Sequence, residues 1–231
     1  LTGPPQRRPH DFLKSLRNDN FKKALARFLV NYWENQLFSP ILQNKKLFVN
    51  LENDFFMYES HENHIRKDEV PELFNTQEEA DSKMLFVATK MSSLAKVVIR
   101  TNDTDVLVIS LANKSKLPAD MKLWIDVVVN SNKTGRYIDV NAIHQSLGDT
   151  LCKALQALRS LTGCDYTASF QRKGKVKPLK LLEKDLETQE VMGRMGEQEN
   201  ILNEDVNVSE KFICNLYGHK NVTYICQRGT P

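Results

Sequence analysis

Hydrophobic side chains follow a helical period soon after the polar first residues of the chain. They recur three or four positions apart at Phe21, Leu25, Phe28, Leu29, Tyr32 and Trp33. This spacing places them on one side of a helix, and the Asn-Asp-Asn run just before them offers suitable N-caps. We therefore expect a core-facing amphipathic helix here.

The next patterns predict strands and then a helix. Residues 45–60 have strand character, interrupted at Asn53–Asp54 by turn residues, which favours a two-stranded hairpin. Residues 60–69 are polar and are expected to form a loop; His61 and His64 have a ligand-like spacing there, but a loop role is the simpler interpretation. Residues 78–95 are expected to be helical.

The second half of the chain alternates between the two periods before it becomes helical. Val97–Ile99 is a compact apolar run typical of a strand buried on both faces. A short helix over 104–113, a strand over 121–130, and a turn and edge strand over 132–140 follow. From Asn141 to Tyr217 only helices are expected. This order indicates an α/β protein with a helical C-terminal flank.

Composition limits the class without identifying a partner. The chain has 231 residues, 26% charged residues and a net charge of +3, values typical of a globular domain. No apolar run is long enough for a membrane span, and the first residues lack the apolar region of a signal peptide. Four cysteines without C-x-x-C spacing indicate reduced thiols, so we expect a nuclear or cytoplasmic protein that is not secreted and has no membrane partner.

Carboxylates stand at three points where a core would not require them. Glu79 and Asp81 open the helix expected over 78–95, Asp103 and Asp105 follow the buried strand, and Asp165 follows a glycine after an apolar helix. Each could simply cap a helix. Together they could form a cluster, because carboxylates that meet at one point require a cation, and Mg²⁺ and Mn²⁺ prefer oxygen ligands.

A basic segment follows Asp165. Its members surround one glycine and are Arg172, Lys173, Gly174, Lys175, Lys177 and Lys180. Cations beside a flexible glycine can bind a phosphate backbone without reading its sequence. The alternative is a solvated helix face, in which Glu183 and Asp185 offset part of the charge.

These motifs resemble those of the flap endonuclease and XPG-type nuclease family. The stretch "EEAD" at 78–81 resembles its E-A-E-A helix entry, "NDTDVLV" at 102–108 its S-x-D-x-D-L-L strand end, and "LTGCDY" at 161–166 its L-x-G-x-D-Y turn. The basic segment then stands against its helix–hairpin–helix motif. The similarity covers roughly residues 76–185 and points to a divergent, little-characterised animal branch.

The resemblance implies a three-layer PIN-like fold with a mostly parallel central sheet. Residues 1–185 would form the nuclease core, with the hairpin motif at 161–185, and residues 186–231 a helical extension. The family hydrolyses phosphodiester bonds with divalent metal, often at junctions or flaps in DNA. The residues that would bind one or two Mg²⁺ or Mn²⁺ ions are Glu79, Asp81, Asp103, Asp105 and Asp165.

Two departures from the family pattern favour a second interpretation. The family has two further aspartates upstream, and nothing before Glu79 matches their context. If further chain precedes Leu1, those acids lie there, and Arg7 and Arg8 would belong to a phosphate-binding segment. In the hairpin, Arg172 replaces a glycine and Pro178 a small residue. The alternative to a nuclease is therefore a catalytically inactive PIN-like module that binds nucleic acid or a protein.

Overall fold

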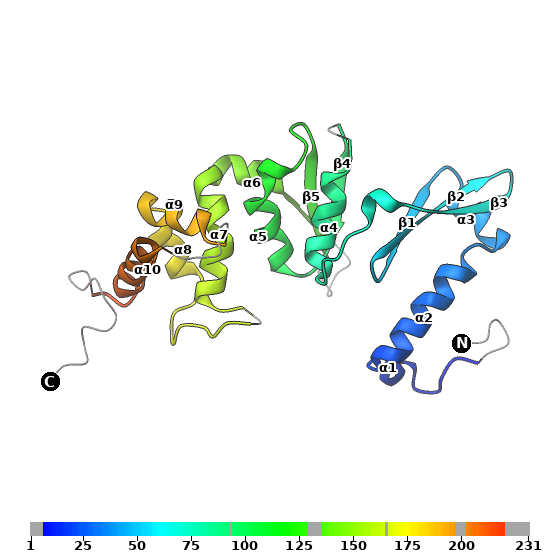
Figure 1. Ribbon diagram of the computed structural model, residues 1–231, viewed down its shortest axis with the longest axis horizontal. Helices are drawn as coiled ribbons and strands as arrows, with labels where there is room; N and C mark the ends of the chain where they lie inside the picture. The colour runs from blue at the N-terminus through cyan, green and yellow to red at the C-terminus, as the bar shows by residue number, and fades with distance from the viewer. Residues whose placement is uncertain (1–6, 93, 129–134, 165, 197–201, 220–231) are drawn as a thin grey trace. The chain divides into compact units, whose positions relative to one another are not determined.

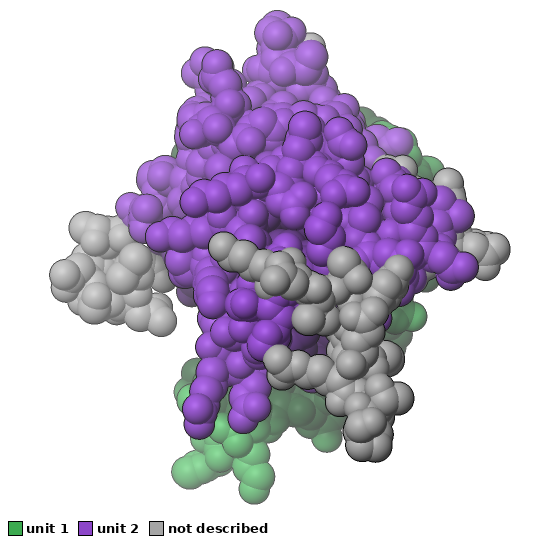
Figure 2. All heavy atoms as spheres, turned by 90° about the vertical axis from the view of Figure 1, so that its left-hand side faces the viewer, with its two compact units in different colours: residues 1–79 green, residues 80–231 purple. Residues whose placement is uncertain are grey.

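The computed structural model divides the chain into two compact units, Leu1–Glu79 and Ala80–Pro231. It describes residues 7–92, 94–128, 135–164, 166–196 and 202–219 (Figure 1). Figure 2 colours the two units separately. The boundary between the units lies inside the 1–185 domain expected from the sequence. It falls immediately before the helix that starts at Ala80.

Unit 1 combines a long helix with an antiparallel sheet. Its elements are α1 (Phe12–Ser15), α2 (Asp19–Tyr32), η1 (Gln36–Phe38), α3 (Ser39–Leu42), β1 (Lys46–Leu51), β2 (Asp54–His61), β3 (His64–Glu69) and η2 (Pro71–Leu73). The expected helix is confirmed: Asn18 caps α2 by accepting a hydrogen bond from the Phe21 amide at 3.0 Å. The expected hairpin is confirmed as β1 and β2.

The loop expected over residues 60–69 is wrong, because β2 continues to His61 and β3 pairs with it in antiparallel register. Glu62 and Asn63 form the two-residue turn with φ of 49° and 67°. Asparagine tolerates this left-handed conformation, and such turns match the twist of a hairpin. The polar composition of β3 reflects an edge strand with half-buried and exposed side chains.

A hydrogen bond joins the helix of unit 1 to its sheet. The Tyr58 side chain on β2 is fully buried, and its hydroxyl donates to the Val30 carbonyl of α2 at 2.5 Å. Burial, with a smaller effect of Glu34, raises the pKa of Tyr58 to about 12. Because a buried hydroxyl without a partner is unfavourable, this bond allows the ring to fill the space between helix and sheet.

Unit 2 contains the second sheet and most of the helices. Its elements are α4 (Ala80–Thr89), β4 (Lys96–Arg100), α5 (Thr104–Ala112), η3 (Lys114–Lys116), β5 (Lys122–Val128), β6 (Gly135–Asp139), α6 (Val140–Leu147), α7 (Asp149–Thr162), α8 (Val176–Leu182), α9 (Leu186–Arg194) and α10 (Asn203–Leu216). The strand order is β4–β5–β6. β4 and β5 are parallel, and β5 and β6 are antiparallel.

The general α/β class is confirmed, and the sheets are smaller than expected. The described residues form two separate three-stranded sheets, whereas one mostly parallel sheet was expected. Within these two sheets, β4 and β5 are the neighbouring strands that run parallel. The burial expected for Val97–Ile99 on both faces is also wrong. Ile99 faces the core at 6% exposure, whereas Val98 points the other way and is 52% exposed.

Two apolar clusters hold unit 2 together. The first joins one face of the sheet, through Leu123 and Ile125, to helices α4 to α7. The second lies around α7 and includes Leu158, Leu182 and Phe212 from α7, α8 and α10. The C-terminal helices α9 and α10 therefore pack with α7 and α8 inside unit 2 (Figure 1). No helix in the described ranges is long and apolar enough to cross a membrane.

Candidate functional site

The carboxyl ends of the parallel strands lie at one edge of the unit 2 sheet. The Thr101 amide, just after β4, donates to the Asp126 carbonyl of β5 at 3.2 Å. Asp103 and Asp105 follow within the next turn. We call Asp103, Asp105 and Asp126 the acidic edge. Ligands of open α/β sheets commonly bind at this end of the strands, so the expected metal site would lie here.

Asp103 and Asp105 are both occupied by contacts within the protein. Asp103 is the N-cap of α5, and its carboxylate accepts from the Asp105 amide at 2.8 Å. The Asp105 carboxylate forms an ion pair with the guanidinium of Arg159, near the C-terminus of α7. Both side chains of this pair are about three-quarters buried, at 26% and 22% exposure. Arg159 therefore supplies the positive charge that a metal would otherwise supply to Asp105.

The other expected ligands do not complete a cluster. Glu79 is exposed and immediately precedes α4, and Asp81 lies in the first turn of that helix, which packs against α5. Asp165 lies outside the described residues. Within the described ranges, no three His, Cys, Asp or Glu side chains gather so that they could hold a metal ion. With Asp105 bound to Arg159, the described acids do not fit Mg²⁺ or Mn²⁺ as ligands in this arrangement.

Asp126 is an acidic residue that the sequence analysis missed. It is 2% exposed, and its Oδ2 accepts from Arg100 Nε at 2.8 Å and from the Arg100 terminal nitrogen at 2.7 Å. Hydrogen bonding to Asp126 raises the pKa of Arg100. The sequence feature that could have identified Asp126 is an aspartate inside the apolar run "LWIDVVV", since a buried carboxylate requires a partner. Asp103, Asp105 and Asp126 thus meet arginines or backbone amides.

The basic segment follows the loop after α7 and continues into α8, and specific contacts bend the backbone of this loop. Gly163 ends α7 with a φ of 104°, where a side chain would be strained and would collide with Ser169. The Lys175 ammonium donates to the Gly163 carbonyl, and the Thr167 hydroxyl to the Ser160 carbonyl at 2.6 Å. Arg172 takes a φ of 57°. Glycine adopts this left-handed conformation more easily than arginine does.

The charges of the basic segment are largely accessible. Arg172, Gly174, Lys175, Lys177 and Lys180 are exposed, and Lys173 is half-buried. Partial burial, and then the neighbouring charge of Lys177, lowers the pKa of Lys173. Like charges repel each other, so an anion bound to both lysines would be stabilised.

Tyr217 is the second residue that sequence reasoning missed. It follows α10, and the Lys173 ammonium lies 4.7 Å from its ring centre. Phe170 meets the same ring edge to face, with centroids 6.2 Å apart. No signal in the sequence links Tyr217 to residues 170–173, because the contact depends on how α10 packs on α8 and α9.

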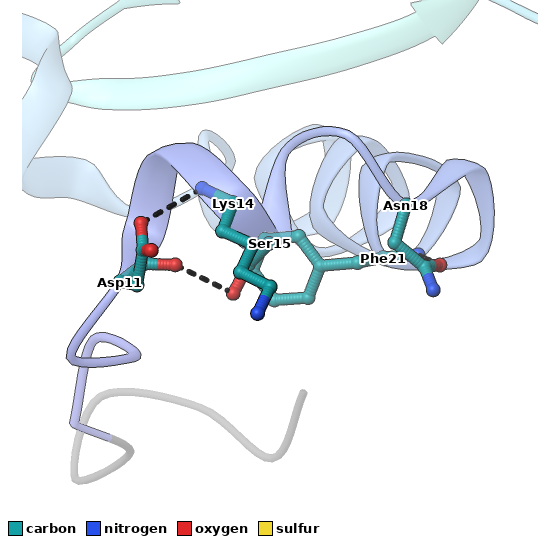
Figure 3. A pocket seen from close by; sticks show the side chains of 5 residues that line it. All are labelled: Asp11, Lys14, Ser15, Asn18 and Phe21. Atoms are coloured by element: carbon teal, nitrogen blue, oxygen red, sulfur yellow. Dashed lines mark hydrogen bonds between the residues drawn. The ribbon is translucent and has the colours of Figure 1, made fainter.

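Arg7 and Arg8 belong to unit 1 and are exposed. The Arg8 guanidinium lies 5.4 Å from the ring centre of Phe12. Nearby, a hollow is lined by Asp11, Lys14, Ser15, Asn18 and Phe21 (Figure 3). Asp11 and Asn18 are engaged as the N-caps of α1 and α2. The polar groups of this hollow therefore serve the helix ends rather than a ligand.

Comparisons with models of known protein families, with curated proteins and with solved structures each found no match to this chain.

Proposed function

We propose that unit 2 is a divergent PIN-like module that binds nucleic acid by its phosphate backbone. The observation that carries this proposal is the set of exposed cations around Gly174, namely Arg172, Lys175, Lys177 and Lys180. Lys177 also lowers the pKa of the half-buried Lys173, and a phosphate bound to this segment would relieve the repulsion between such like charges. Such contacts bind DNA or RNA of any sequence and weaken steeply with salt.

The arginines at the acidic edge favour binding over hydrolysis. Asp105 and Asp126 are each neutralised by an arginine of the same chain. In such a binding module, the nucleic acid would lie next to the acidic edge, and the carboxylates of that edge would stabilise the fold instead of binding metal. Of the two interpretations that the resemblance allows, this is the catalytically inactive PIN-like module.

Metal-dependent hydrolysis is the second candidate, and one observation favours it. Asp103 and Asp105 lie at the carboxyl end of parallel strands, where the resembling nucleases hold their metal. Glu79, Asp81 and Asp165 would have to join them, and Arg159 would have to release Asp105. Mg²⁺ or Mn²⁺ bound there would polarise the phosphate and activate water; the preferred substrate would then be DNA with a flap or junction.

Backbone binding is tested by a salt titration. Affinity for a labelled 5′-flap DNA is measured by fluorescence anisotropy at several salt concentrations, once in EDTA and once in Mn²⁺. We expect binding in both, and we expect Lys177→Gln to lower the salt slope by about 1. The matched control is Lys22→Gln on α2, an exposed lysine paired with Asp19. An unchanged slope, or no binding at low salt, would refute backbone binding by the basic segment.

Hydrolysis is tested separately with the same DNA. If unit 2 is an inactive binding module, the labelled flap stays intact in Mg²⁺ or Mn²⁺. Cleavage that disappears in Asp105→Asn and persists in Lys22→Gln would establish the second candidate in its place.

A further inference from the structure

Aromatic side chains from distant parts of the chain lie beside the basic segment. Tyr217 follows α10, whereas Phe170 lies in the loop after α7. Their rings meet edge to face, and the Lys173 ammonium lies 4.7 Å from the Tyr217 ring centre. Lys177 is near enough to lower the pKa of Lys173, so a second cation accompanies Lys173 and the two rings.

The Tyr217 ring remains accessible. Tyr217 is 39% exposed, and Phe170 is half-buried. A single exposed tyrosine is ordinary in a folded protein. Accessible rings beside a run of cations are instead the composition of surfaces that bind single-stranded nucleic acid, in which bases stack on rings and cations contact the backbone.

Resting on the proposed function, we infer that the partner is a single-stranded stretch of nucleic acid. Its bases stack on Tyr217, and its phosphates contact Lys173 and Lys177. In a duplex the base faces are covered by their neighbours, so only a single strand can use the rings. The phosphate contacts serve both forms alike, which makes the rings the element that selects between them.

Three ligands of equal length separate this inference from the proposed function. They are an unstructured oligo-dT, an abasic oligodeoxynucleotide and a blunt DNA duplex, compared by anisotropy at one low salt concentration. Since stacking is worth about 1–3 kcal/mol per base, we expect oligo-dT to bind about 5-fold or more tightly than the abasic strand. Tyr217→Ala should remove most of this difference and leave duplex binding within about twofold.

Two further variants exclude a general effect on folding. Tyr217→Phe keeps a ring for stacking and should bind oligo-dT as the wild type does. Tyr137→Ala removes another exposed tyrosine, on β6, and should change nothing. Thermal unfolding of each variant is recorded with the binding data, and a loss in Tyr217→Ala that Tyr217→Phe does not share identifies the ring as the cause.

The outcomes distinguish the two proposals. Equal binding of oligo-dT and the abasic strand, with duplex binding retained, would overturn the single-strand inference and leave backbone binding intact. Binding of a poly-glutamate peptide as tight as that of oligo-dT would also overturn it. No binding of any of the three nucleic acids at low salt would refute both proposals.

Discussion

The Arg159 guanidinium forms an ion pair with the Asp105 carboxylate and so ties the end of α7 to the start of α5. Asp105 is one of the residues expected to bind metal, and its partner comes from the helix that leads into the basic segment. The pair links the acidic edge to the segment proposed to bind phosphate. It also gives the first prediction.

We expect Arg159→Gln to lower the free energy of unfolding by about 1–3 kcal/mol, because it leaves a largely buried carboxylate without its partner. The same variant should gain affinity for Mn²⁺, since Asp103 and Asp105 then lack a neighbouring cation. Thermal unfolding with and without Mn²⁺ measures both effects.

The matched control for this variant is Arg194→Gln, which breaks the ion pair with Asp205 between α9 and α10. It should lose stability without gaining a response to Mn²⁺. An equal Mn²⁺ response in both variants would show that Arg159 does not fill the place of a metal.

The Arg100–Asp126 pair predicts an asymmetry between two substitutions. Arg100→Ala leaves a carboxylate that is 2% exposed without a cation, which should cost about 3 kcal/mol. Asp126→Asn releases an arginine whose side chain is 72% exposed and can be hydrated, so it should cost less. Urea unfolding of both variants measures the difference, and a larger loss for Asp126→Asn would contradict this account.

The buried hydroxyl of Tyr58 predicts a loss of stability at alkaline pH. The pKa of Tyr58 is about 12 in the folded chain, above the ordinary tyrosine value of 10.0. Because the folded pKa is raised, its contribution is complete below pH 10 and is lost as pH rises toward 12. The loss is of the order of 2 kcal/mol over this range.

Urea unfolding of the whole chain at several alkaline pH values measures this loss. Tyr58→Phe serves as the control: it leaves the Val30 carbonyl unpaired and should lose about 1 kcal/mol near neutral pH. It should also lack this alkaline transition. A wild-type transition that persists in Tyr58→Phe would assign it to another group.

The thiols should differ in their reaction with iodoacetamide. Burial, and then Asp149, raises the pKa of Cys152 to about 11. Hydrogen bonding from Thr167 lowers the pKa of Cys164, which is half-buried. Because the thiolate is the reactive form, Cys164 should be alkylated first and Cys152 only after unfolding.

Mass spectrometry of a Cys226→Ser background follows the two sites without interference from the C-terminal thiol. Thr167→Val removes the hydrogen bond to the Cys164 sulfur, which spans 3.2 Å, and should slow its alkylation. Equal alkylation rates at Cys152 and Cys164 in the folded chain would contradict the predicted difference between the two thiols.

The helices and most strands could be read from the sequence because periodicity and caps act locally. α2, α4, α5 and α7 lie within the ranges expected for them, and the hairpin of β1 and β2 follows from turn residues between apolar runs. β3 was missed because an edge strand with polar side chains has no apolar alternation. Its pairing depends on β2, which lies on the other side of a turn.

The metal cluster is the expectation that the described residues do not support. Asp103 and Asp105 follow the end of β4, as their spacing and residue type predicted. Spacing could not reveal that Arg159 would reach Asp105, since the two residues are far apart in the chain and meet through the packing of α5 on α7. The partner of Asp126 could not be predicted for the same reason, because Arg100 meets it across the β4–β5 pairing.

By itself, therefore, the sequence determined the local elements, the α/β class and the positions of the acids and cations. Only the tertiary structure decided which charges meet: arginines at the acidic edge, and Tyr217 beside Lys173. The physical reason is the difference in range between the interactions involved. Periodicity and capping act within a few residues along the chain, whereas ion pairs and ring contacts depend on distances in space that only the packing of helices and strands defines.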